Sequence, residues 1–473
     1  MASDRSVSRI ATINPPSAAG LPECIDDARS AALDSDPGLE IPLEYKPLLA
    51  RLEAVGERFP PLYQKAMAQP FTETLTRLGE RKFKSILAQD PYHESSAGLL
   101  LDIAQALLQQ GEDYLEVATD AFQEVVSDLY DGFLSAADRR GVKPPDRGVV
   151  TPLVKWGNPD FGPYTWPVDA TFSFGAAAGI VSLPPANARA GLLAWSALGH
   201  ETAGHDILHA DDGLQLELAD ELRRRLTSLG HGLADYWADR IDETASDVMG
   251  ILNMGPAAAL GLIGYFRALN AAFSGDARLR CEGAEDDPHP VDVLRGFLGA
   301  EVVNLLQFTG HTKWSKLLQD ETAHDLGRIS IDRRELPLDV ARQSTRLVAE
   351  TLVSYKARNL EEHALGDIQN WRDKDERKVR ALRTALRTGA QPPAELLIET
   401  YAAHAVAAAV VEGAADGSQL PQVFARMLAV LKAMHDKNPA WGPLFVVHPG
   451  SMTRQRLYYP LRSAELLVDT PQS

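Results

Sequence analysis

The feature that most constrains this chain is a short run of metal-binding residue types near its centre. The run extends from Gly199 to His209 and reads G-H-E-T-A-G-H-D-I-L-H, with three histidines and two carboxylates among its residues. It follows the apolar residues 192–195 directly. Zinc sites that keep an open position for water use three protein ligands, and two of these often come from histidines on one helix. The sequence therefore predicts a metal-binding helix over residues 188–209.

The first possible pair of ligands is His200 and His205, with Glu201 between them as a general base. Their five-residue spacing corresponds to a rotation of about 140° on an α-helix, which places the two rings on different faces. They can share a metal ion only if the helix absorbs one extra residue, as a π-bulge does. Gly204 would ease that distortion. We favour this pair and expect a π-bulge at this place.

The second possible pair is His205 and His209, which have the ordinary four-residue spacing of H-x-x-x-H motifs. The base would then be Asp206, whose side chain is one methylene shorter than that of glutamate. Residues 210–213 read A-D-D-G and indicate a helix end, which argues against this pair. The simplest other interpretation, histidines with ordinary hydrogen bonds, suits one isolated residue better than a cluster.

A second acidic cluster, residues 242–247, follows about forty residues later and reads D-E-T-A-S-D. We expect it on a helix over residues 233–252, where a carboxylate would supply the third metal ligand. His231 precedes this helix, and we interpret it as a structural histidine.

Glu243 and Asp247 form an E-x-x-x-D pattern that resembles the third-ligand helix of the gluzincin metallopeptidases. The H-E-x-x-x-H spacing resembles that of the dipeptidyl-peptidase III family within this group. The resemblance implies zinc ligation by His200, His205 and Glu243, with Glu201 as general base. It also implies that Asp247 fixes the tautomer of a ligand histidine.

The resemblance covers only the two motifs, and it departs from the dipeptidyl-peptidase III pattern at two positions. That family has E-E-x-x-x-E in its second motif, whereas Asp242 and Asp247 stand here in place of two of the glutamates. The chain is also too short for the two-lobed architecture of that family. The resemblance therefore implies a gluzincin-like site and not that family's substrate.

A further motif, H-P-x-x-x-x-R, extends from His289 to Arg295. It is similar to a motif after the third ligand in HtpX-type gluzincins, whose region steadies the tetrahedral oxyanion. By this analogy His289 or Arg295 would be the electrophilic partner. The alternative is an ordinary helix start, with Pro290 in the first turn and a solvated Arg295. A tyrosine or histidine near the C-terminus (His448, Tyr458, Tyr459) is a further candidate for this role.

Composition limits the classes of partner. Lys and Arg number 47 against 65 Asp and Glu, a net charge of −18, which argues against nucleic-acid or anionic-membrane binding as the main role. The two cysteines, Cys24 and Cys281, belong to no C-x-x-C motif, which favours a reducing, cytoplasmic setting. Apolar stretches such as residues 257–265 are too short to span a bilayer, and we identify no signal peptide.

Hydrophobic periodicity predicts a mostly α fold with a gluzincin-like catalytic core, a small β-sheet, and helical regions on both sides. Strands are expected at residues 170–174 and 179–183, the second as an edge strand that pairs with extended peptide. The Pro-, Gly- and Trp-rich residues 142–168 suggest a domain boundary. The expected organisation is a loose arm (1–40), a helical lobe (41–145), a zinc-binding core (146–300) and a C-terminal helical lobe (301–473).

These observations predict a zinc-dependent metallopeptidase that acts on a peptide or protein substrate. Zn²⁺ would bind water, Glu201 would deprotonate it, and the resulting nucleophile would attack the peptide carbonyl. Two alternatives stay open. One is a non-catalytic helical scaffold with a structural zinc ion, and the other is a zinc amidohydrolase for a non-peptide substrate. The sequence indicates neither the oligomeric state nor a choice between exo- and endopeptidase action.

Overall fold

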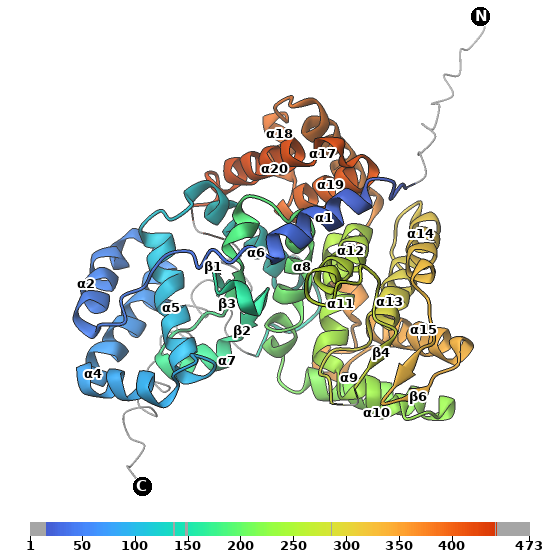
Figure 1. The fold of residues 1–473 in the computed structure, drawn as a ribbon, viewed down its shortest axis with the longest axis horizontal. Coiled ribbons are helices and arrows are strands. Elements are labelled where there is room, and N and C mark those ends of the chain that lie inside the picture. The colour runs from blue at the N-terminus through green and yellow to red at the C-terminus, as the bar shows by residue number, and fades with distance from the viewer. Residues whose placement is uncertain (1–15, 136–137, 147–149, 285, 440, 442–473) are drawn as a thin grey trace, which may run out of the picture.

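The fold is mostly α-helical, as predicted (Figure 1). The structure is a computed structural model, and it describes residues 16–135, 138–146, 150–284, 286–439 and 441. In these ranges the helices far outnumber the strands, which form two small three-stranded sheets. None of the helices in these ranges combines the length and the apolar character that a membrane span requires.

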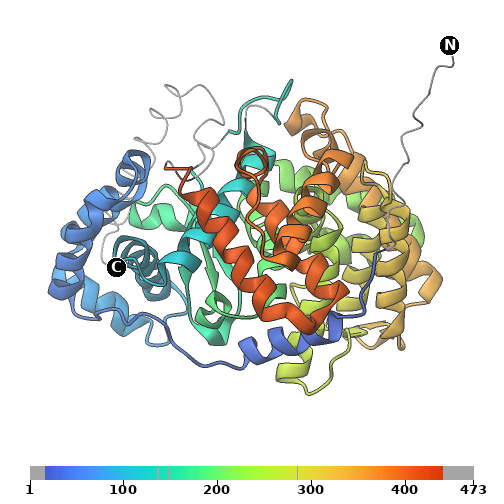
Figure 2. The same cartoon turned by 90° about the horizontal axis from the view of Figure 1, so that it is seen from above.

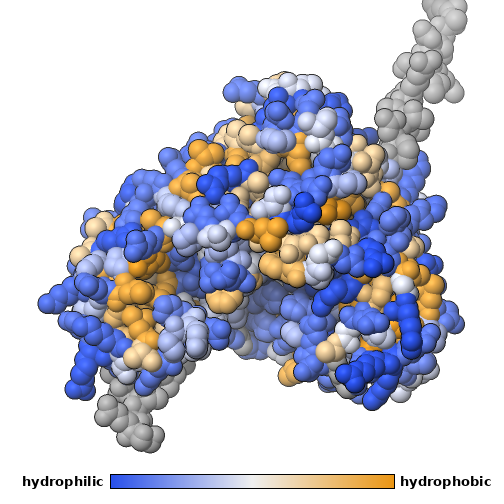
Figure 3. All heavy atoms as spheres, in the orientation of Figure 1, coloured by the Kyte–Doolittle hydropathy of each residue, from blue (hydrophilic) through white to orange (hydrophobic). Residues whose placement is uncertain are grey.

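The helices pack around two hydrophobic cores. The smaller core holds α2 (Tyr45–Val55), α3 (Pro61–Tyr63), α4 (Gln69–Gln89) and α5 (Ser96–Gly111), which form the blue lobe of Figure 1. The larger core includes α6 (Glu116–Leu134) and contains the two helices of the predicted metal site. Figure 3 shows that the surface is hollowed between the lobe of α2 and α4 and the opposite lobe of α9 and α10.

Most of the remaining helices also contribute residues to the larger core, and Figure 2 shows the C-terminal group lying over it when the molecule is seen from above. Their bounds are α9 (Leu214–Leu226), α10 (Leu233–Ala238), α12 (Pro256–Phe273), α13 (Asp292–Asn304), α14 (His311–His324), α15 (Leu338–Ser354), α16 (Leu365–Ile368), α17 (Asp373–Thr388), α18 (Ala394–Glu399), α19 (Ala402–Ala415) and α20 (Leu420–His435). The second sheet is formed by β4 (Glu282–Gly283), β5 (Ser330–Ile331) and β6 (Arg334–Glu335).

The first sheet has the order β1-β3-β2, from β1 (Leu153–Trp156), β3 (Ile180–Leu183) and β2 (Tyr164–Trp166). β3 pairs in parallel with β1 and antiparallel with β2. The prediction of a strand over residues 179–183 is confirmed, but its placement at the edge of the sheet is wrong. β3 is the central strand, its four residues are all buried, and β2 is the edge strand beside it.

The strand predicted over residues 170–174 is also wrong. The chain there forms α7 (Val168–Thr171) and a 3-10 helix (Phe172–Phe174). The alternation of Phe172 and Phe174 with polar residues suggested a half-buried strand, but the hydroxyls of Thr171 and Ser173 donate to backbone carbonyls three residues earlier. Such local bonds compete with sheet pairing, and Gly175, with φ of 84°, ends the turn.

The segment expected to be a loose arm, residues 1–40, contains a packed helix, α1 (Leu21–Ala32). Leu21, Cys24 and Ala28 are buried in the larger core. The carboxylate of Asp27 accepts hydrogen bonds from the backbone nitrogens of residues 191 and 192, at 2.8 and 3.1 Å. These amides begin α8 (Leu192–Ala203), and its N-cap residue, a glycine, has no side chain to satisfy them. α1 therefore caps the metal-site helix from a distant part of the chain.

The helix α8 lies in direct backbone contact with α11 (Ile241–Met254). A Cβ atom on Gly250 would lie 2.8 Å from the carbonyl carbon of Gly199 and 3.0 Å from the nitrogen of His200. A Cβ atom on Gly204 would lie 1.5 Å from the hydroxyl oxygen of Ser246. Glycine is required at these places because the helices approach closely, so the glycines set the distance between the two helices.

The variant Gly250→Ala should lower the free energy of unfolding by about 1–3 kcal/mol, because its methyl group would push α11 away from the backbone of His200. Chemical denaturation of the purified variant measures this change. Gly56→Ala is the matched control, because no atom lies within 4 Å of the added methyl group and φ is −55°. Equal stability of the two variants would contradict the close contact.

Candidate metal centre

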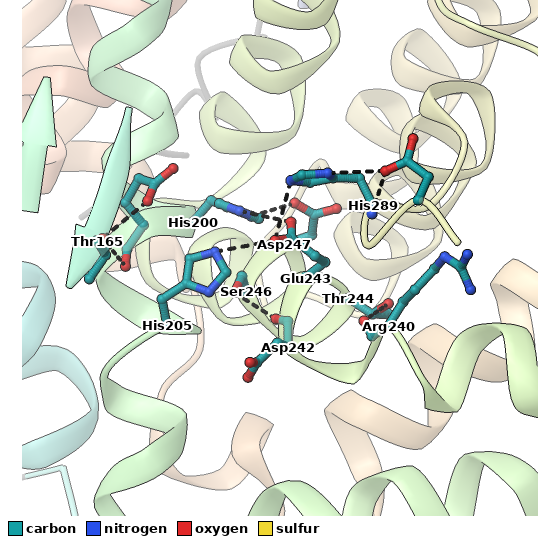
Figure 4. Close-up of polar contacts among 12 residues, drawn as sticks. Thr165, His200, His205, Arg240, Asp242, Glu243, Thr244, Ser246, Asp247 and His289 are labelled. Atoms are coloured by element: carbon teal, nitrogen blue, oxygen red, sulfur yellow. Dashed lines mark hydrogen bonds and ion pairs between the residues drawn. The ribbon is translucent and has the colours of Figure 1, made fainter. Parts of the chain in front are cut away.

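Three predicted ligands come together where α8 and α11 cross. One ligand atom each from His200, His205 and Glu243 lies within 4.8 Å of the other two. The Nε2 atom of His200 is 3.3 Å from Oε2 of Glu243, and Nε2 of His205 is 3.4 Å from Oε1. Figure 4 shows both rings turned toward the glutamate. Among the described residues this is the one group of three His, Cys, Asp or Glu side chains close enough to share a metal ion.

The five-residue spacing is accommodated by the end of the helix and not by the predicted π-bulge. α8 ends at Ala203, and His205 lies in the turn between α8 and a 3-10 helix, Ile207–Ala210. The continuous helix predicted over residues 188–209 is therefore wrong at its C-terminal end. Because the turn redirects the chain, the two imidazole rings face each other edge to face, with their centroids 5.1 Å apart.

The alternative pair of His205 and His209 is not assembled. The Nε2 atom of His209 lies 3.0 Å from Oδ1 of Asp242, in an ion pair beside the cluster. Asp206, the alternative base, is buried and accepts hydrogen bonds from the hydroxyl of Tyr130 and the backbone nitrogen of Val168. Burial raises the pKa of Asp206 to about 6. The carboxylate of Asp206 thus connects α6, through Tyr130, to the start of α7, through Val168.

The orientation of His200 is set by Asp247, one turn after Glu243 on α11. Oδ1 of Asp247 lies 2.9 Å from Nδ1 of His200, which leaves Nε2 facing Glu243. Arg295 on α13 donates two hydrogen bonds to the same carboxylate, from Nε at 2.8 Å and Nη2 at 2.7 Å. All of these groups are buried. A carboxylate that holds the second nitrogen of a histidine is the usual support of a metal ligand.

The cluster attracts positive charge. Burial alone would lower the pKa of His200, but its contacts with Asp247 and Glu243 outweigh burial and raise that pKa to about 10. Burial would likewise raise the pKa of Glu243, but His200 and Arg295 hold it well below the usual range. The two nitrogens and the carboxylate therefore face a place where either a proton or a metal cation would be stabilised.

Glu243 provides a test of whether a metal ion fits. Its Oε2 atom is buried and accepts no hydrogen bond. A buried carboxylate oxygen that accepts no hydrogen bond is costly, and a divalent cation between the two histidines and this oxygen would remove the cost. Two imidazoles and one carboxylate are a ligand set that zinc accepts with an open fourth position. The residues present therefore fit the ion.

Glu201 lies next to this cluster with its side chain held by β2. The hydroxyl of Thr165 lies 3.1 Å both from Oε2 and from the backbone oxygen of Glu201. Thr165 thereby orients the carboxylate that the sequence predicts as a general base. No sequence signal pointed to Thr165, because its contact with Glu201 arises only when β2 lies against α8.

The two candidates of the H-P-x-x-x-x-R motif take different places. His289 is half-exposed, and its Nε2 lies 3.4 Å from Oε1 of Glu243 (Figure 4). Arg295 is buried between Asp247 and the ring of Phe266, so the alternative of a solvated arginine is wrong. α13 begins only at Asp292, so the alternative that Pro290 occupies its first turn is also wrong. The C-terminal candidates, His448, Tyr458 and Tyr459, lie outside the described residues.

A cavity of about 360 Å³ opens beside the cluster, lined by His200, Glu201 and His289 at one end. Tyr265 of α12 lines the same cavity and was missed by the sequence analysis, because it stands in an apolar run typical of core residues. Burial and the negative charge of Glu201 raise the pKa of Tyr265. Its hydroxyl is therefore protonated at neutral pH and available as a hydrogen-bond donor.

The chain matches no protein-family model, and neither the search of curated proteins nor the search of solved structures found a similar one.

Arg295→Met should lower the free energy of unfolding of the metal-free protein by about 3–5 kcal/mol, because it leaves the buried Asp247 without its main partner. The double variant Asp247→Leu/Arg295→Met should lose less, since no charge is left uncompensated at either position. Urea denaturation measures both values. Lys316→Met, which breaks an ion pair whose two side chains are both exposed, is the control and should change stability little. A larger loss in the double variant would contradict this account.

Proposed function

We propose that this chain is a zinc-dependent metallopeptidase. The observation that carries the proposal is the convergence of His200, His205 and Glu243 beside a second carboxylate, Glu201, and an open cavity. The resemblance of both motifs to gluzincins supports the same activity. Zinc supplies a Lewis acid that polarises a carbonyl group and lowers the pKa of a water molecule.

The residues of the chain would transfer the protons and hold the reacting groups in position. Glu201 would accept the proton of the attacking water on Oε1, the carboxylate oxygen that Thr165 does not engage, and later pass it to the leaving amine. Thr165 is a positioning residue, because its hydroxyl holds this carboxylate. Asp247 and Arg295 are likewise positioning residues, because they hold the ring of His200. The side chain of Arg295 is engaged by Asp247, so we no longer assign it to the oxyanion.

Two other groups are better placed to stabilise the oxyanion. His289 has one face open to the cavity and a ring nitrogen close to Glu243. Tyr265 lines the same cavity with a protonated hydroxyl. Preorganised donors of this kind stabilise the charge that develops on a tetrahedral intermediate.

The position of β2 supports an extended peptide as the substrate. β2 is at the edge of its sheet, and Thr165 in this strand contacts Glu201 directly. An extended peptide that pairs with the outer edge of β2 would therefore carry a backbone carbonyl past the metal centre. We therefore assign peptide binding by strand pairing to β2 and not to residues 179–183.

The rival interpretation as a scaffold with a structural zinc ion explains less. Structural zinc sites are closed by four protein ligands, whereas this cluster offers three and borders a cavity. A structural site also has no use for a carboxylate held by Thr165 beside the ligands. A non-peptide amide as the substrate would use the same residues, and substrate assays separate the two.

Metal analysis of purified protein is the first test. We expect one zinc ion per chain in the wild type and its loss in His200→Ala, His205→Ala and Glu243→Ala, because each removes one of three ligands. His209→Ala is the matched control and should keep zinc, since His209 pairs with Asp242 outside the cluster. Wild type that takes up no zinc after reconstitution, or zinc lost with His209, would contradict the assignment.

Glu201→Gln should keep zinc and lose peptide hydrolysis, because the amide preserves the shape but cannot accept the proton. A loss of at least about 100-fold in kcat is expected for removal of a general base. A library of quenched fluorescent peptides measures turnover, with metal content determined on the same samples. Retained hydrolysis in this variant would contradict the mechanism.

A further inference from the structure

One helix face forms much of the wall of the cavity beside the metal centre. Leu262, Phe266, Leu269 and Phe273 of α12 are spaced by three or four residues, so they lie along one side of the helix, and all four line the cavity. Ala197 of α8 contributes to the lining close to the ligand His200. The wall that the second half of α12 contributes to the cavity is thus mostly apolar, with Tyr265 and Asn270 as its polar members.

Two large aromatic side chains of this lining are exposed. Phe273, the last residue of α12, has 69% of its surface exposed, and Phe161 has 48%. They come from separate elements, since Phe161 ends a 3-10 helix just before β2. Exposed apolar groups that border one cavity indicate a surface that binds an apolar group.

The basic side chains of the lining are already paired. Arg280 donates from Nε and Nη2 to Oδ1 of Asp292, and its Nη1 lies 3.2 Å from Asp287. Asp292 also accepts from Asn270, and Arg295 is held by Asp247. No other Arg or Lys side chain contributes to the lining among the described residues. A free carboxylate entering the cavity would therefore meet no unpaired Arg or Lys side chain among the described residues.

The acidic side chains of the lining offer no buried, unpaired carboxylate that could bind a free amine away from the metal site. Asp292 is neutralised by Arg280, and Glu201 belongs to the metal end, where a zinc ion would compete with an amine. Asp160 is exposed and precedes Phe161 on its 3-10 helix, so its charge is hydrated. Placing a charged terminus among these apolar side chains would cost desolvation without a buried partner.

We propose that this cavity binds an uncharged apolar side chain, aliphatic or aromatic, next to the scissile bond of an internal or end-blocked peptide segment. This proposal rests on the metallopeptidase function proposed above and names its substrate class. The volume of about 360 Å³ suits it, because it is near the lower end of the range for small-molecule sites, roughly 300–1,000 Å³. One large side chain with its flanking peptide units fits such a space.

The first experiment compares hexapeptides that are acetylated at one end and amidated at the other. They differ at one central residue, which is Phe, Leu, Lys or Asp. We expect kcat/KM of the zinc-loaded wild type to be at least about 10-fold higher for Phe and Leu than for Lys and Asp. A dipeptide that contains Phe and has free amino and carboxyl ends should be hydrolysed more slowly than the blocked Phe hexapeptide. Mass spectrometry of the products locates the cleaved bond.

The second experiment measures binding without turnover, by calorimetry of the same peptides with Glu201→Gln. The blocked Phe and Leu peptides should bind at least about 10-fold more tightly than those with Lys or Asp. Phe273→Ala, introduced into this background, should weaken binding of the Phe peptide. Leu216→Ala is the matched control, because Leu216 is exposed to 70% but does not line the cavity.

Ala197→Leu tests the size of the cavity independently. Its larger side chain would fill space next to His200 and should shift the preference from Phe toward a smaller central residue, such as Ala or Val. Circular dichroism and zinc content of each variant show that the fold is kept.

The outcomes separate the two proposals. Cleavage with equal rates for all central residues, or with a preference for Lys, Asp or free ends, overturns the cavity assignment and leaves the peptidase standing. Selective binding of the Phe and Leu peptides without any cleavage by the wild type supports the cavity and contradicts the peptidase. If no peptide is bound or cleaved, both proposals are overturned.

Discussion

The candidate metal centre depends on one contact, the direct approach of the backbones of α8 and α11. Gly199 and Gly250 meet with no space for a side chain, and Gly204 lies against Ser246 in the same way. Without this approach, Glu243 on α11 would not reach the two histidines at the end of α8. The glycines between and beside the ligands therefore matter because two helices touch there, and not because the backbone needs a left-handed conformation.

Sequence spacing pointed to His200 and His205, and the resemblance to gluzincin motifs pointed to Glu243. The structure brings the three side chains together. It did not identify how they meet. The five-residue interval suggested a bulge inside one helix, whereas α8 ends after Ala203 and a turn presents His205. Gly204 contacts Ser246, which lies forty-two positions later in the chain. Spacing within one motif carries no information about such a contact.

Contacts between distant segments also explain the other differences between sequence and structure. Periodicity predicted a mostly helical fold, which is confirmed, because helical repeats are local. Asp27, however, caps α8 from a segment that was expected to be a loose arm, and Thr165 reaches Glu201 from the edge strand β2. Neither residue belongs to a motif of the sequence, so only the folded chain reveals its partner.

Buried charge around the centre is arranged so that each group restrains the next. Arg295 is held between Asp247 and the ring of Phe266, and Asp247 in turn orients His200. The same Phe266 forms part of the cavity wall on α12. The side chains that hold His200 and the wall of the cavity thus share one aromatic ring. If the cavity binds the proposed substrate, a change in its apolar wall would reach His200 through Arg295 and so couple substrate recognition to the geometry of the proposed metal ligand.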